Sequence, residues 1–119
     1  MPKAHTPGMA IPHALSGQVI ELAPSFASAA DLNTHALFKT DAIEVIRLVL
    51  AAGKSLPPHT VVGDITIQCL QGKIDISFDG TRQVLSEGQL LYLAGGVEHA
   101  VRAHEDSLAL VTIVLRKRL

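Results

Sequence analysis

Two stretches that each run from a glycine to a histidine decide the fold of this chain: Gly53-Lys54-Ser55-Leu56-Pro57-Pro58-His59 and Gly88-Gln89-Leu90-Leu91-Tyr92-Leu93-Ala94-Gly95-Gly96-Val97-Glu98-His99. In each stretch, a turn glycine leads through a strand-sized run to a single histidine, and more strand pattern follows. The first stretch closes at Gly72. Together they predict a small β-barrel in which two histidines point at one pocket.

The rest of the chain consists of short runs that favour strands. Residues 43–50 also fit a helical period, but their β-branched content favours a strand. Asp79-Gly80 is a type I′ hairpin signal between the runs 73–78 and 83–85. The other expected strands are residues 18–22, 36–39, 61–62, 65–70, 89–93, 99–103 and 108–115. Roughly eight to ten short strands without intervening helices predict an all-β sandwich or barrel.

The length of 119 residues predicts a single core, preceded by an irregular segment. We expect residues 1–36 to hold an N-terminal arm and a first strand, and residues 37–119 to form the barrel domain. Hydrophobic residues make up 48% of the chain and charged residues 18%, which excludes disorder over most of it. This apolar share is high for so small a body, so we expect part of it to form the interface of a homodimer.

Charge and cysteine usage narrow the class of partner. The net charge of −1 provides no field that favours nucleic acid or an anionic membrane. No apolar run approaches the ~20 residues that span a bilayer, and we expect no signal peptide. The one cysteine, Cys69, excludes an intramolecular disulfide and fits a reducing compartment. We therefore expect a cytoplasmic protein whose partner is a small molecule.

The two opening stretches resemble the paired motifs of the cupin superfamily. The residues that fall at the family's positions are Gly53, His59 and Gly72 in the first motif, and Gly88, Gly96 and His99 in the second. The hairpin signal Asp79-Gly80 lies in the spacer, and the matches span residues 53–103. The resemblance implies a double-stranded β-helix, the cupin jelly-roll barrel, and frequent dimerisation.

The departures from the family pattern concern its metal ligands. Metal-bearing cupins hold Fe, Mn, Ni, Zn or Cu through three histidines and one glutamate. Val61 stands here in place of the second histidine and Ile65 in place of the glutamate, so that only His59 and His99 remain. Two further family positions, a proline and an asparagine, are Ala94 and Ala103. A divalent transition metal is therefore one expectation for the pocket, with His59 and His99 as ligands.

Strand alternation gives a separate view of the same pocket. His59, Val61, Ile65 and Cys69 share one parity, which predicts two imidazoles and one thiol in an aliphatic wall. Two neutral imidazoles alone hold a divalent ion poorly, so a metal needs a third ligand. Asp64 could supply it if a bulge turned its side chain inward. The alternatives are that Cys69 is a buried small hydrophobe and that the histidines are a relic pair bonded to water or to each other.

Two other side chains are candidates for the pocket. Arg47 lies within a run of aliphatic residues and could bind an anionic ligand bidentately, or pair with Glu44 or Glu21. Tyr92, the only tyrosine, could place its hydroxyl at the pocket mouth, or pack as an ordinary aromatic side chain. Both are kept as expected lining residues.

Three functions fit these observations. The first is a small cupin-fold protein that binds a small, largely apolar or weakly acidic molecule between the two histidines. The second is a metal-dependent enzyme of dioxygenase, isomerase or decarboxylase type with a substitute third ligand. The third is a non-catalytic dimeric module that acts through association. Fold alone does not separate them, because one fold supports many chemistries.

Overall fold

The computed structural model describes residues 13–22 and 32–116, and these residues form nine strands and no helix. The strands are β1 (His35–Lys39), β2 (Ile43–Leu50), β3 (Ser55–His59), β4 (Ile65–Gln71), β5 (Lys73–Phe78), β6 (Thr81–Ser86), β7 (Leu90–Leu93), β8 (His99–Ala103) and β9 (Ser107–Val114). The all-β prediction is confirmed. No helix in this part of the chain is long and apolar enough to cross a membrane.

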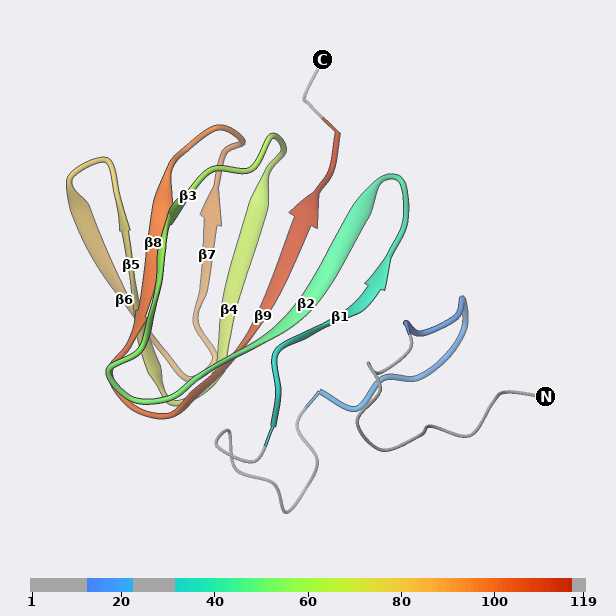
Figure 1. Ribbon diagram of the computed structural model, residues 1–119, viewed down its shortest axis with the longest axis horizontal. Helices are drawn as coiled ribbons and strands as arrows, with labels where there is room; N and C mark the ends of the chain where they lie inside the picture. Colours follow the sequence, from blue (N-terminus) through green and yellow to red (C-terminus); the bar gives the residue numbers. More distant parts are fainter. Residues whose placement is uncertain (1–12, 23–31, 117–119) are drawn as a thin grey trace.

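The strands form two antiparallel sheets that face each other as a jelly-roll barrel (Figure 1). One sheet has five strands in the order β1-β2-β9-β4-β7, and the other has four in the order β3-β8-β5-β6. Several neighbouring strands come from distant parts of the sequence, as where β2 and β4 both pair with β9. The pairing of β3 with β8 brings the two glycine-to-histidine stretches together.

Alternation along each strand builds the core. Ile65, Ile67 and Cys69 of β4 are buried, and Ile74 and Ile76 of β5 lie against them from the other sheet in one cluster. Each fully buried isoleucine contributes about 1.5–3 kcal/mol relative to an exposed one. The inward face is therefore fixed by the same period-two pattern that the sequence displays.

The β5–β6 connection is the hairpin predicted from Asp79-Gly80. Both residues have positive φ, 49° at Asp79 and 71° at Gly80, as a type I′ turn requires. Lys73 pairs with Ser86 and Phe78 with Thr81, so the turn sets the register of the whole ribbon.

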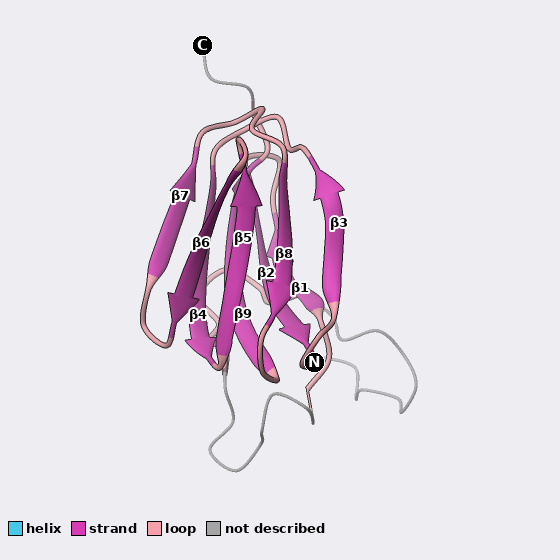
Figure 2. Cartoon of the chain, turned by 90° about the vertical axis from the view of Figure 1, so that its left-hand side faces the viewer, coloured by secondary structure: helices cyan, strands magenta, loops and turns pink. Residues whose placement is uncertain are grey.

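Two loops close one end of the barrel, residues 60–64 between β3 and β4 and residues 94–98 between β7 and β8 (Figure 2). The backbone N–H of Gly96 donates to the carbonyl of Val61 at 2.9 Å. The backbone N–H of Gly95 donates to Oδ1 of Asp64 at 3.0 Å. These bonds hold the loops against each other beside the ends of the strands that carry the histidines.

Two strand predictions are wrong. Residues 61–62 lie in a loop, whereas Ser55–His59, with Pro57 and Pro58, forms β3. This is possible because β3 is an edge strand and because its pairing with β8 shifts register between Leu56 and His59, where the two prolines lie. Residues 18–22 also form no strand.

Two further predictions concern the N-terminal boundary and the oligomeric state. β1 begins at His35, so the predicted division between residues 36 and 37 falls inside a strand. Residues 1–12 and 23–31 of the predicted arm lie outside the described residues. The homodimer stays a prediction; Leu90 and Tyr92 of the edge strand β7 are exposed apolar side chains.

Candidate functional site

His59 and His99 face each other at one end of the barrel. β3 and β8 pair antiparallel with these two residues in register, although 40 positions separate them in sequence. The centroids of the two imidazole rings lie 4.4 Å apart, with an angle of 56° between the ring planes. His59 is exposed, whereas His99 is only 2% exposed. The pair thus reaches from solvent into the interior.

The backbone favours the same tautomer for both rings. Nδ1 of His59 lies 3.3 Å from the carbonyl oxygen of Pro57, and Nδ1 of His99 lies 3.0 Å from that of Val97. A carbonyl oxygen can only accept, so each Nδ1–H donates and each neutral ring keeps its lone pair on Nε2. The site therefore offers two neighbouring acceptors whose orientation is set by the chain itself.

An aliphatic cavity of about 90 Å³ lies beneath the rings. Besides His59 and His99 its walls are Ile46, Leu48, Leu56, Ile65, Ile67, Val101, Val111 and Ile113. Engineered apolar cavities of ~150 Å³ take up benzene, so this one suits a group smaller than a benzene ring. The sequence predicted Ile65 and the histidines as pocket residues; the other walls follow from the alternation in β2, β3, β4, β8 and β9.

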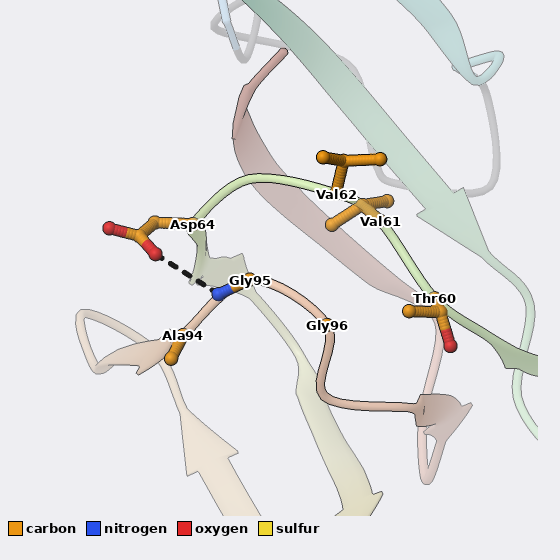
Figure 3. A pocket seen from close by; sticks show the side chains of 7 residues that line it. All are labelled: Thr60, Val61, Val62, Asp64, Ala94, Gly95 and Gly96. Carbon is orange, nitrogen blue, oxygen red and sulfur yellow. Dashed lines mark hydrogen bonds between the residues drawn. The ribbon is translucent and has the colours of Figure 1, made fainter. Parts of the chain in front are cut away.

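A larger open groove of about 630 Å³ runs along the two loops at the same end (Figure 3). Its lining residues are Thr60, Val61, Val62, Asp64, Ala94, Gly95 and Gly96. Val61, predicted for the ligand pocket, lines this outer groove.

The donors available here do not fit a catalytic transition metal. Among residues 13–22 and 32–116 there is no group of three or more His, Cys, Asp or Glu side chains that could hold one. The family positions that would complete the set are Val61 and Ile65, which have no donor atom. Asp64, the candidate third ligand, accepts from the N–H of Gly95 and so ties the two loops together.

Cys69 lies in phase with the cavity but far from its mouth. It follows Ile65 by four strand residues, roughly 13 Å, and its side chain is fully buried. Burial first, and then the negative charges of Glu87 and Glu105, raise the pKa of its thiol. A protonated thiol is a weak nucleophile and a poor metal ligand, so Cys69 serves the packing of the core.

The structure places Arg47 and Tyr92 away from the histidine pair. Arg47 alternates with Ile46 and Leu48, which point into the cavity, and it lines a separate groove outside the five-stranded sheet. Tyr92 is 53% exposed, since its neighbour Leu93 occupies the core. The alternation of apolar residues along each strand could have predicted from the sequence that Arg47 and Tyr92 point away from the cavity.

Comparisons with known proteins agree with this fold. No curated protein matches the chain. A conserved Streptococcus pyogenes protein of unknown function superposes with a TM-score of 0.73 at 20% identity, covering 93% of this chain and 99% of that one. For a cupin superfamily protein from Desulfitobacterium hafniense the TM-score is 0.70 at 19% identity, with 83% and 100% covered.

An enzyme is also among the similar structures. A mutant salicylate 1,2-dioxygenase from Pseudoaminobacter salicylatoxidans has a TM-score of 0.59 at 16% identity, with 62% of this chain and 21% of that chain covered. At such identities the likeness concerns the fold alone. Residues 46–115, more than half of the chain, match the family described as the cupin domain. The chain therefore belongs to the cupin-domain family.

Proposed function

We propose that this protein binds a small, uncharged organic molecule at the mouth of the barrel. A short branched alkyl group fills the aliphatic cavity, and a hydrogen-bond donor next to it reaches the Nε2 atoms of His59 and His99. One observation carries the proposal: two imidazoles 4.4 Å apart, each held by its Nδ1, stand over an apolar cavity of about 90 Å³.

The chemistry of the walls selects the class of ligand. Every cavity residue other than the two histidines is aliphatic, so an inserted alkyl group loses contact with water and meets no buried polar atom. Two neutral acceptors favour a group with N–H or O–H donors, such as a primary amide or an alcohol. A ligand without a donor leaves His99, which is almost fully buried, without a partner for its Nε2.

Calorimetric titration with a matched probe pair tests the proposal. Isovaleramide and methyl isovalerate share a branched alkyl group, but only the amide has N–H donors. At about pH 8, we expect the amide to bind with a roughly millimolar Kd and the ester about tenfold more weakly. Acetamide, which lacks the alkyl group, is the second control and is expected to bind weakly.

The same titration separates this function from a metal site. We expect dialysis against EDTA to leave the affinity for isovaleramide unchanged, because no ligand set for a metal takes part. Equal binding of the amide and the ester would contradict the role of the histidines. Loss of amide binding after EDTA treatment would instead favour the metal-dependent alternative.

A further inference from the structure

Arg47 is a buried cation outside the barrel. It lies in the middle of β2 with its side chain on the outer face of the five-stranded sheet, and only 6% of the residue is exposed. In this register it stands opposite His35 on β1 and Leu110 on β9. A guanidinium taken out of water at such a position needs acceptors or a counter-charge.

The described residues give this guanidinium few hydrogen-bond acceptors and no counter-charge in contact with it. Of its five N–H donors, those on Nη2 have two long contacts, 3.5 Å to the carbonyl oxygen of Asn33 and 3.3 Å to Nδ1 of His35. Its Nε is buried and has no hydrogen-bond partner. The ion pairs of residues 13–22 and 32–116 do not include Arg47. Burial alone lowers its pKa, without an opposing contribution from a carboxylate.

Arg47 lines a groove of about 240 Å³. One wall is the sheet, with His35 and Leu37 of β1, and the other is the segment 13–22. That segment contributes Ala14, Gln18, Val19, Ile20 and Glu21. It is fastened to β1 where the backbone N–H of Ala14 donates to the carbonyl of Leu37 at 2.8 Å. The groove thus combines apolar side chains with polar ones, and Arg47 is the arginine among them.

We propose that this groove is a second binding site, which takes a small organic carboxylate with an apolar body. The carboxylate accepts from the guanidinium of Arg47, and the apolar part lies along Leu37 and Ile20. A planar carboxylate matches the fork of guanidinium donors and supplies the direct carboxylate contact that no described residue makes to Arg47. This site is separate from the histidine pair, on the other side of the sheet.

The other titratable groups at the groove set the selectivity. Glu21 lines the groove and repels an anion, but it is exposed, so water and salt screen its charge. Nδ1 of His35 lies 3.3 Å from Nη2 of Arg47, where it would accept, and 3.4 Å from the carbonyl oxygen of Asn33, where it would donate, so its tautomer decides which bond forms. The group that attracts an anion to this groove is therefore the guanidinium of Arg47.

Benzoate and benzamide are matched probes, with one planar shape and different charge. The readout is the NMR resonance of the Arg47 Nε–H group, assigned by its absence in Arg47→Lys. We expect benzoate to move this resonance with a roughly millimolar Kd and benzamide to leave it in place. A resonance that stays fixed in about 50 mM benzoate, or that moves equally with both probes, would overturn the proposal.

Variants separate a free ligand from a carboxylate of the chain itself. We expect Arg47→Met to weaken benzoate binding at least about tenfold, and Arg102→Met, at an exposed arginine on β8, to leave it unchanged. Glu21→Gln is expected to tighten benzoate binding about twofold, since it removes a like charge. The same measurement on Asp31→Asn covers the one acidic side chain outside the described residues. If either acidic variant moves the Nε–H resonance and leaves benzoate binding no tighter, that residue is the partner of Arg47 and the proposal is overturned.

Discussion

Gly63→Ala is expected to lower the stability of the protein by about 3 kcal/mol, which corresponds to a fall in melting temperature of roughly 10–15 °C. Gly63 is buried in the loop between β3 and β4. An added Cβ would overlap the backbone carbonyl of Val114 and come within 2.9 Å of the carbonyl oxygen of Arg116. Backbone atoms cannot turn aside as a flexible side chain can, so the loop and the end of β9 must separate.

The substitution Gly63→Ala should also weaken contacts outside the loop. The backbone N–H of Val114 donates to the carbonyl of Asp64 at 2.8 Å, and this bond lies directly beside the new methyl group. Gly53→Ala is the matched control, because Gly53 has a positive φ of 80° but nothing within 4 Å of an added Cβ. We expect it to cost about 1 kcal/mol through backbone strain alone. Thermal unfolding followed by circular dichroism checks both, and equal melting temperatures for the two variants would contradict the clash.

The second large effect is expected on binding. His99→Leu keeps a side chain of similar size in the barrel but removes the acceptor Nε2, so the affinity for isovaleramide should fall at least about tenfold. Because His99 is 2% exposed and leucine suits the aliphatic surroundings, we expect the variant to stay folded. Calorimetric titration under the wild-type conditions measures the change.

Two further variants serve as a second test and a control for His99→Leu. His59→Leu removes the exposed member of the pair and is expected to weaken amide binding in the same direction. His13→Leu replaces an exposed histidine that lies outside the barrel and should leave the affinity unchanged. Undiminished affinity in His99→Leu, with a folded variant, would show that isovaleramide binds without the histidine pair.

Much of the fold could be predicted from the sequence, because local rules and the global fold agree. Asp79-Gly80 sets a two-residue turn, and the β-branched run of β2 forms a strand although it also fits a helical period. The edge strand β3 could not be predicted in the same way. Pro57 and Pro58 argue against a strand until it is known that one side of that strand has no neighbour.

The site could be predicted only in part. The glycine-to-histidine spacing predicted that His59 and His99 point at one pocket, and they meet because β3 pairs with β8. Arg47 was expected at the pocket because it lies among aliphatic residues, but the parity of β2 turns it outward. The role of Asp64 could not be predicted, because its side chain accepts from the N–H of Gly95 in another loop, and such a contact leaves no periodic pattern in the sequence.

The most direct measurement of the central claim locates the bound probe. In protein labelled at the isoleucine δ1 methyl groups, we expect isovaleramide to shift the resonances of the cavity residues Ile46, Ile65, Ile67 and Ile113. The resonances of Ile74 and Ile76, which are buried in the core but do not line the cavity, should stay nearly fixed. Shifts confined to the four cavity methyl groups are the predicted result. Saturable binding that leaves those four unchanged would contradict the account.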